Sequence, residues 1–190
     1  MIPRNINNDD VIILALGDVS YSRDIGKYIN NCKKNDYTYP LNNVKKYLKN
    51  SHVTLANLES IIADEGNEEI NKSTIRFRAD EKSLKGLKDS GINLVNLANN
   101  HSNDYGKIGL KDSINNLLNN KIDIIGVKPY IYKIYKINLL KIGFIGVTKF
   151  FNKLNNNDLI NILDNNILKL IKKLKNKVDI LILSIHWGNE

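Results

Sequence analysis

The chain has 190 residues, of which 42% are apolar and 25% charged, the composition of one globular domain over residues 1–190. The lone Cys32 excludes an internal disulfide, and no apolar run reaches the roughly 18–20 residues of a membrane span. The net charge of +8 comes mainly from dispersed lysines, without the arginine cluster or aromatic row of nucleic-acid-binding proteins. We therefore expect no nucleic-acid partner.

The first apolar run ends in Gly17-Asp18 and indicates a strand, not a signal peptide, so the chain as it stands is predicted to be cytoplasmic. Apolar periodicity then predicts, in order, a strand at 11–16, helices at 24–32 and 41–48, a strand at 53–58, a polar loop at 60–71 and an extended segment at 73–78. A helix ending at Gly91 and a strand at 92–97 follow.

The second half predicts a helix at 110–118, a strand at 122–127, a hairpin of 131–137 with 141–147, and a loop at 152–158. A helix at 163–174 then leads into a strand at 178–185 that is apolar enough to be buried on both faces. This alternation predicts an α/β fold with a mostly parallel central sheet. The loops after its strands should meet at one edge.

Polar side chains follow four of these strands. They are Asp18 after the first strand, Glu59 after the second, the run Asn99, Asn100, His101 and Asp104 after the third, and His186 with Glu190 after the last. Carboxylate, amide and imidazole donors together suit Mn, Fe or Zn better than Ca or Mg. Two metals sharing a carboxylate can activate a water, and His101 can protonate a leaving group.

Each of these residues also has an ordinary structural explanation. An Asp after a Gly is commonly a turn or helix cap, and Glu59 can simply face solvent. Asn99 and Asn100 suit positive φ in a chain that is rich in Asn. Their common position at strand ends is what favours a functional site.

Five segments carry a family resemblance. They are LALGDVSYSRDI (14–25), LANLES (55–60), IRFRADEKSLKGLKDSGINLVNLANNHSNDYGKIGL (75–110), KIGFIGVT (141–148) and LSIHWGNE (183–190). In this order they resemble the CapA-type proteins of poly-γ-glutamate capsule biosynthesis, which are similar in fold to the calcineurin-like metallophosphoesterases. The resemblance implies a metallophosphatase-like layered α/β sandwich.

The resemblance also implies roles for the residues at the strand ends. Asp18 would be a ligand of a first divalent metal, Glu59 the bridging carboxylate, Asn100 and His186 ligands of a second metal, and His101 the catalytic acid. Arg23 and Arg78 would hold an anionic group by bidentate contacts. The further candidates for substrate binding are Asn99, Asp104 and Glu190.

The implied function is a part in the synthesis or export of poly-γ-glutamate or a related anionic capsule polymer. Its partners would be that polymer or a phosphate-containing substrate, and the membrane machinery of capsule synthesis. Two alternatives stay open: a metal-dependent phosphoesterase acting on a small phosphate ester, and a non-catalytic scaffold that binds an acidic polymer.

The sequence departs from the metallophosphoesterase pattern in two places. Ser20 stands where a His usually follows the first Asp, and the chain stops at Glu190 before any Gly-His-x-His segment. We therefore expect a domain that lacks its C-terminal βα units and an incomplete metal site. Family members often act at the cell surface with an N-terminal membrane anchor, and the sequence shows no such anchor, so we expect this chain either to be intracellular or to be missing its anchor.

Overall fold

The structure, a computed structural model, describes residues 10–68, 75–150 and 159–188. In its first half the elements are β1 (Ile13–Val19), α1 (Arg23–Cys32), the 3-10 helix η1 (Tyr39–Leu41), α2 (Lys45–Leu48), β2 (Val53–Leu58), β3 (Ile61–Ile62), β4 (Arg78–Ala79) and α3 (Ser83–Ser90). In its second half they are β5 (Leu94–Asn96), α4 (Gly106–Asn119), β6 (Asp123–Ile125), β7 (Tyr132–Ile137), β8 (Leu140–Thr148), α5 (Asn165–Lys175) and β9 (Ile180–His186).

Two sheets of different kinds form the centre of the molecule. The parallel sheet has the strand order β1-β2-β5-β6, and every neighbouring pair in it is parallel. The mixed sheet has the order β7-β8-β9, in which β7 and β8 form an antiparallel hairpin and β9 runs parallel to β8. The short strands β3 and β4 pair separately.

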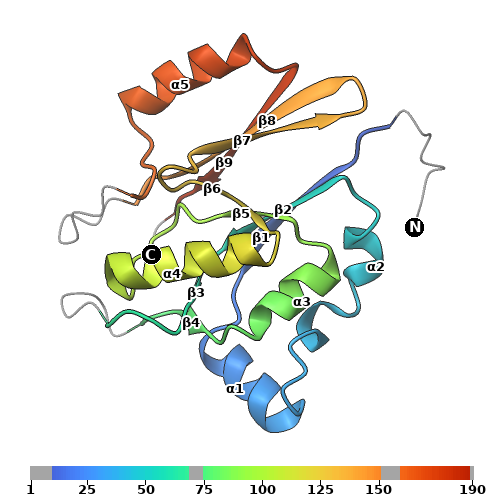
Figure 1. The fold of residues 1–190 in the computed structure, drawn as a ribbon, viewed down its shortest axis with the longest axis vertical. Coiled ribbons are helices and arrows are strands. Elements are labelled where there is room, and N and C mark those ends of the chain that lie inside the picture. The colour runs from blue at the N-terminus through green and yellow to red at the C-terminus, as the bar shows by residue number, and fades with distance from the viewer. Residues whose placement is uncertain (1–9, 69–74, 151–158, 189–190) are drawn as a thin grey trace.

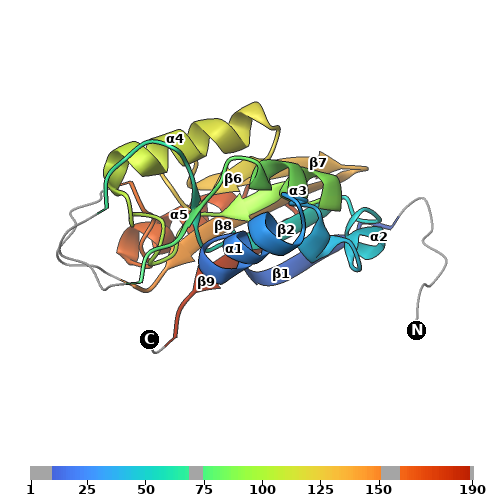
Figure 2. The same ribbon diagram turned by 90° about the horizontal axis from the view of Figure 1, so that it is seen from below.

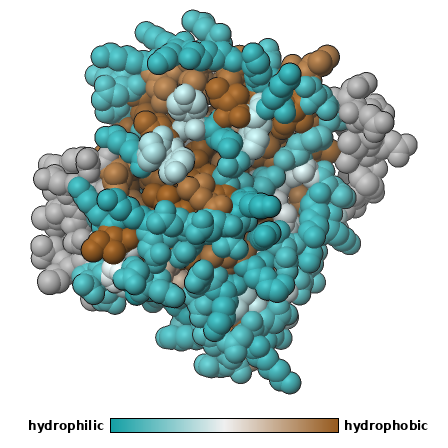
Figure 3. Space-filling view, in the orientation of Figure 1, coloured by the Kyte–Doolittle hydropathy of each residue, from teal (hydrophilic) through white to brown (hydrophobic). Residues whose placement is uncertain are grey.

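The sheets and helices stack in four layers (Figures 1 and 2). Helix α5 covers the outer face of the mixed sheet, where Ile167 and Leu174 pack with Ile145 and Val147. The two sheets face each other across a second apolar cluster, and α1, α3 and α4 cover the far face of the parallel sheet across a third. Figure 3 shows apolar side chains in the band between α5 and α4, with hydrophilic residues above and below it.

Strand β2 shows how the sequence produces these layers. Every residue of β2 is buried, because helices cover one face and the mixed sheet covers the other. Val53 and Leu55 belong to the cluster between the sheets, while Ala56 and Leu58 belong to the cluster under the helices. Side chains alternate along a strand, so Asn57 continues the Val53 and Leu55 face toward the mixed sheet.

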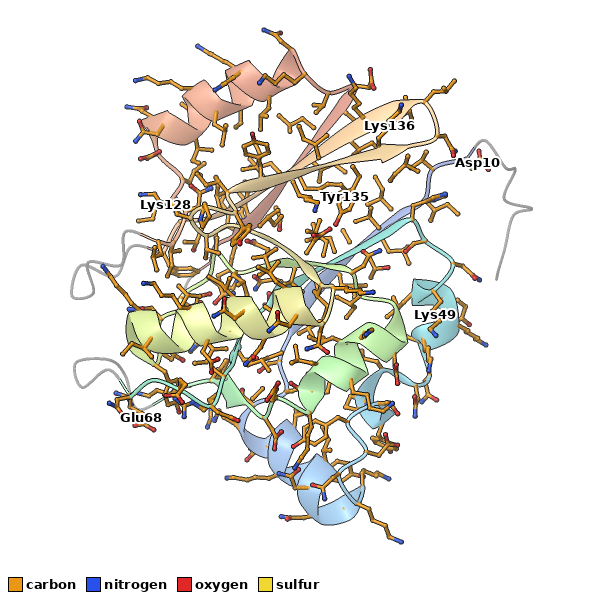
Figure 4. The ribbon with its side chains drawn as sticks, viewed as in Figure 1. Asp10, Lys49, Glu68, Lys128, Tyr135 and Lys136 are labelled. Atoms are coloured by element: carbon orange, nitrogen blue, oxygen red, sulfur yellow. The ribbon has the colours of Figure 1, made fainter. Side chains whose placement is uncertain are left out.

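The two sheets are joined by polar contacts at both ends. At the amino end of β6, Asp123 accepts hydrogen bonds of 2.7 Å from Lys133 Nζ and from the Tyr135 hydroxyl, which points inward from β7 (Figure 4). Further along, Asn96 Nδ2 donates to Ser184 Oγ at 3.3 Å. A side chain at Gly146 would lie 2.3 Å from Asn96 Oδ1, so glycine is required for this close approach.

Most predicted elements are confirmed, with differences at their boundaries. The strand at 53–58 and the hairpin are confirmed, and the helix that ends at Gly91 is capped there in the left-handed conformation, with φ 99°. The helix at 41–48 is instead η1 and α2, and the loop at 60–71 contains β3. The loop at 152–158 lies outside the described residues. Among the described residues, no helix combines the length and apolar character that a membrane crossing requires.

Two predictions about the strands are wrong. The last strand is not buried on both faces: Ile180 is 44% exposed, because β9 lies at the edge of the mixed sheet, paired with β8 alone among the described strands. The strand ends therefore do not converge at the edge of one sheet, since β9 belongs to a different sheet from β1, β2 and β5. The site must be assembled between two sheets.

Candidate functional site

Asp18 enters the site from within β1, not from a turn after it. A register shift between Ala15 and Asp18 interrupts the pairing with β2, and the strand continues to Val19. Asp18 is the most open of the predicted ligands, with its side chain 56% exposed. Its Oδ1 accepts a 2.7 Å hydrogen bond from Asn57 Nδ2.

His186 is the last residue of β9 and brings the mixed sheet into the site. Its Nδ1 lies 3.1 Å from Asn57 Nδ2 and 3.7 Å from Asp18 Oδ1. Its other nitrogen, Nε2, lies 2.8 Å from Asn100 Oδ1 and 3.8 Å from Glu59 Oε1. One imidazole therefore contacts all three other predicted metal ligands, Asp18 on one side and the other two on the opposite side. We call Asp18, Glu59, Asn100 and His186 the donor row.

His101 lies beside the donor row, with its Nε2 3.9 Å from Glu59 Oε1. Its Nδ1 faces Asp104 Oδ2 at 2.7 Å, and the same oxygen accepts a 2.8 Å hydrogen bond from the Phe77 amide. The Phe77 ring stacks on the imidazole, with centroids 3.9 Å apart and planes 16° apart. Asp104 and Phe77 thus fix the orientation of the His101 ring and turn its Nε2 toward Glu59.

Asn99 is buried and ties the loop after β5 to β2. Its Nδ2 donates to Leu58 O at 2.9 Å and to Asn57 Oδ1 at 3.2 Å. Its Oδ1 accepts from the His101 amide at 3.1 Å and from Ser102 Oγ at 2.9 Å. These contacts anchor the loop that carries Asn100 and His101 beside the end of β2.

The two predicted arginines have different surroundings. Arg23 begins α1 at a positive φ of 52°, and its guanidinium carbon lies 5.9 Å from the centre of the Phe77 ring that stacks on His101. Arg78 instead donates to the carbonyls of Glu65 at 3.0 Å and Gly66 at 2.6 Å. Its guanidinium also lies over the Tyr105 ring, and its role in anion binding stays a prediction.

Glu190, a further predicted substrate-binding residue, lies outside the described residues.

Asn57 and Phe77 belong to the site, and the sequence interpretation missed both. Asn57 contacts two members of the donor row, and Phe77 contacts His101 by its ring and Asp104 by its amide. The sequence does contain a sign of Asn57. It is the polar residue on a face of β2 whose two preceding residues, Val53 and Leu55, are apolar. Phe77 has none, since a lone aromatic residue between two arginines is usually read as packing.

The distances between pairs of donor atoms in the donor row can be compared with the distance between two ligands of one divalent cation. Two ligands about 2.1 Å from one ion lie about 3.0 to 4.2 Å apart for angles between 90° and 180° at the ion. Two atom pairs of the donor row, Asp18–His186 and Glu59–His186 at 3.7 and 3.8 Å, fall in that range. Within the described residues, however, no three His, Cys, Asp or Glu side chains form a closed metal-binding group. The donor row thus matches a metal in ligand type and in the spacing of two pairs, while the described residues form no complete metal site.

Comparisons with known proteins show which family this chain resembles and how much of it is matched. The family model described as "Bacterial capsule synthesis protein PGA_cap" matches residues 12–190. The chain is 31% identical over 121 residues to "Capsule biosynthesis protein CapA" of Bacillus anthracis. It is 28% identical over 120 residues to "PGA biosynthesis protein CapA" of Bacillus subtilis strain 168. Each match covers 63% of this chain but only 29% and 31% of those relatives.

Solved structures share the fold at low sequence identity. A novel phosphatase from Mycoplasma pneumoniae aligns with a TM-score of 0.52 and 16% identity, over 93% of this chain and 55% of that one. A putative 5'-nucleotidase from Staphylococcus aureus aligns with a TM-score of 0.53 and 13% identity, over 94% of this chain and 37% of that one. These likenesses show the predicted layered α/β fold with a parallel central sheet, and they cover only part of each neighbour.

Proposed function

Because this chain belongs to the PGA_cap family of bacterial capsule synthesis proteins, we propose that its donor row supports a metal-assisted hydrolysis or transfer step on an anionic capsule polymer. The single observation that carries the proposal is the position of His101 Nε2, 3.9 Å from Glu59 Oε1 and directed by Asp104 behind it. An oriented imidazole next to clustered carboxylate and amide oxygens suits proton transfer to a leaving group.

In this proposal His101 is the general acid and Asp104 its positioning residue. A carboxylate accepts hydrogen bonds, so the 2.7 Å contact with Asp104 Oδ2 places a proton on Nδ1 of His101. The second proton of the imidazolium then sits on Nε2, the nitrogen that faces Glu59. Nε2 gives this proton to the leaving group, an amide nitrogen in poly-γ-glutamate or an oxygen in a phosphate ester, as its bond to the attacked carbon or phosphorus breaks, and Asp104 stabilises the imidazolium beforehand. We therefore place Asp104 behind His101, where its side chain is 2% exposed, and not against substrate.

The donor row would hold one or two ions of the Mn, Fe or Zn type, through Asp18, Glu59, Asn100 and His186. When bound, such ions lower the pKa of a water and polarise a phosphoryl or acyl oxygen. Arg23 is the cation we assign to the substrate, because it begins α1 beside the Phe77–His101 stack and is exposed there. Its positive φ is a strained conformation for a non-glycine residue, of the kind that is found at functional sites.

The test compares a capsule polymer with small phosphate esters. The purified chain is stripped with EDTA, reloaded with Mn²⁺, and incubated with poly-γ-glutamate and with a panel of phosphate mono- and diesters. We expect Mn²⁺-dependent binding or shortening of the polymer, lost in EDTA, and slow turnover of the esters.

Two other results would contradict this proposal and favour a different function. Rapid Mn²⁺-dependent turnover of a small ester, without any effect on the polymer, identifies a phosphoesterase. Polymer binding that ignores EDTA but falls steeply with salt identifies a scaffold that binds through its lysines. Exposed lysines on α5 would supply that surface.

A further inference from the structure

The turn between β7 and β8 carries an exposed leucine. Ile137 pairs with Leu140, so Asn138 and Leu139 form a two-residue loop. Asn138 has the positive φ, 53°, that is common in such loops, and turn positions are usually filled by Gly, Asn, Asp, Pro or Ser. Leu139 is 93% exposed, the highest value among the large apolar side chains of the described residues. The geometry of the turn does not account for a leucine there.

Leu139 stands at the end of an apolar surface that begins inside the molecule. Ile137 packs against the apolar cluster between the two sheets, and its register partner Leu140 lies on the same face, 36% exposed. On the neighbouring strand, Ile180 pairs with Ile142 and is 44% exposed. We call Leu139, Leu140 and Ile180 the apolar tip.

Exposed lysines surround the apolar tip. Lys136 and Lys141 are register partners on the two sides of the turn, and Figure 4 shows Lys136 near the end of the hairpin. Lys175 and Lys177 lie at the end of α5 and just after it, within five residues of Ile180. The tip therefore combines apolar side chains at its apex with ammonium groups behind them.

Two carboxylates lie at the same end of the molecule. Asp179 Oδ2 accepts a 2.7 Å hydrogen bond from the Lys141 amide, so this carboxylate is bound to the backbone of the hairpin. Asp10 lies near the hairpin, at the start of the described chain (Figure 4). Four lysines against two carboxylates leave the surroundings of the tip positively charged.

We propose that the apolar tip is a contact site for the surface of an anionic lipid bilayer. Leu139 enters the boundary between headgroups and acyl chains, with Leu140 and Ile180 behind it, and the lysine ammonium groups contact lipid phosphates. A convex turn fits a deformable lipid surface, whereas a folded protein partner would need a matching hollow. The tip touches one face of the bilayer and does not cross it.

The tip and the donor row lie at opposite ends of β9. Ile180 is the first residue of this strand and His186 the last, so about 20 Å separates them along the strand. A bilayer at the tip would leave the donor row free of lipid. The proposal does not rest on the metal-dependent function, and binding to vesicles is expected to be equal in EDTA and in Mn²⁺.

The experiment measures sedimentation of the chain with vesicles of phosphatidylcholine alone and of phosphatidylcholine mixed with phosphatidylglycerol. We expect binding to the mixed vesicles only. Leu139→Ser is expected to weaken it about 10-fold, because one buried leucine is lost. The double variant Lys136→Gln/Lys141→Gln is expected to weaken it about 25-fold, since each lysine near an anionic surface contributes about fivefold. These side chains are exposed, so the melting temperature should stay unchanged.

Helix α4 provides matched controls. Ile108 is 66% exposed near the start of α4, at the end of the molecule away from the hairpin turn in both views (Figures 1 and 2). Lys107 and Lys111 are exposed on the same helix. Ile108→Ser and Lys107→Gln/Lys111→Gln therefore make the same chemical changes elsewhere, and they should bind mixed vesicles within about twofold of the parent.

A second readout follows insertion itself. Trp187 is the single tryptophan of the chain, so Trp187→Phe combined with Leu139→Trp places one indole at the apex of the turn. Its emission is expected to shift to shorter wavelength with mixed vesicles, because the indole leaves water.

Several results would overturn the proposal. They are a parent chain that does not bind mixed vesicles, a Leu139→Ser variant that binds like the parent, and an indole at position 139 whose emission does not shift. Equal losses in the α4 variants would also contradict it, because binding would not depend on the tip. If soluble poly-γ-glutamate displaces the parent from vesicles, and Lys136→Gln/Lys141→Gln no longer binds that polymer, the lysines serve an acidic polymer and the proposal is wrong.

Discussion

Replacing His101 by alanine is expected to lower the rate of the metal-dependent reaction by about 10²- to 10⁴-fold, the usual contribution of a positioned general acid. The reason is that the Nε2 proton facing Glu59 is removed, while the donor row itself is untouched. The measurement is kcat on whichever substrate the polymer and ester panel identifies, together with Mn²⁺ affinity, which should change little.

His52→Ala is the matched control for this variant. His52 is exposed and precedes β2 at the opposite end of that strand, where its Nδ1 accepts from the Ile12 amide at 3.1 Å. It should leave kcat unchanged. A His101→Ala variant that retains the parent's kcat would exclude His101 as the acid.

Replacing His186 by alanine has the largest effect that we expect on metal binding. His186 lies against every other member of the donor row, through Nδ1 to Asp18 and through Nε2 to Glu59 and Asn100. In the proposed metal site its loss would remove a ligand and leave Asp18, Glu59 and Asn100 without their partner from the mixed sheet. We expect Mn²⁺ affinity to fall by more than about 100-fold, which exceeds the effect typical of residues that only orient a metal ligand.

Ser184→Ala on the same strand is the control for this second variant. Ser184 Oγ accepts from Asn96 Nδ2 between the sheets and should be dispensable for Mn²⁺ binding. Calorimetry and the shift of melting temperature with Mn²⁺ measure both variants. Mn²⁺ affinity in His186→Ala equal to that of Ser184→Ala would remove His186 from the set of ligands.

Local sequence patterns were sufficient to predict where most strands and helices lie. The strand at 53–58 was predicted to the residue, because a mainly apolar run, broken only by Thr54 and Asn57, ends there before Glu59 and Ser60. The strand predicted at 11–16 is observed at Ile13–Val19, so it was predicted to begin two residues early and to end three residues early, since Gly17 and Asp18 suggest a turn but remain in β1 across an irregular register. Turn-forming residues do not end a strand whose neighbour continues to pair with it.

The division into two sheets could not be predicted, and it determines the site. Apolar alternation says that a strand has a buried face, but it does not say which sheet the strand joins. His186 was therefore expected at the same sheet edge as Asp18, whereas it reaches Asp18 from across the interface. Asn57 was missed for the same reason, because its importance depends on the sheet that it faces.

The most direct test of the donor row is to locate a bound ion. Crystals of the protein grown with Mn²⁺ would be measured near the manganese absorption edge, and an anomalous difference map would be calculated. We predict a peak about 2.0–2.3 Å from a His186 nitrogen and from a carboxylate oxygen of Glu59 or Asp18, the usual distances for such ligands. A map with no peak at these residues, or with its only strong peak elsewhere on the protein, would contradict the account.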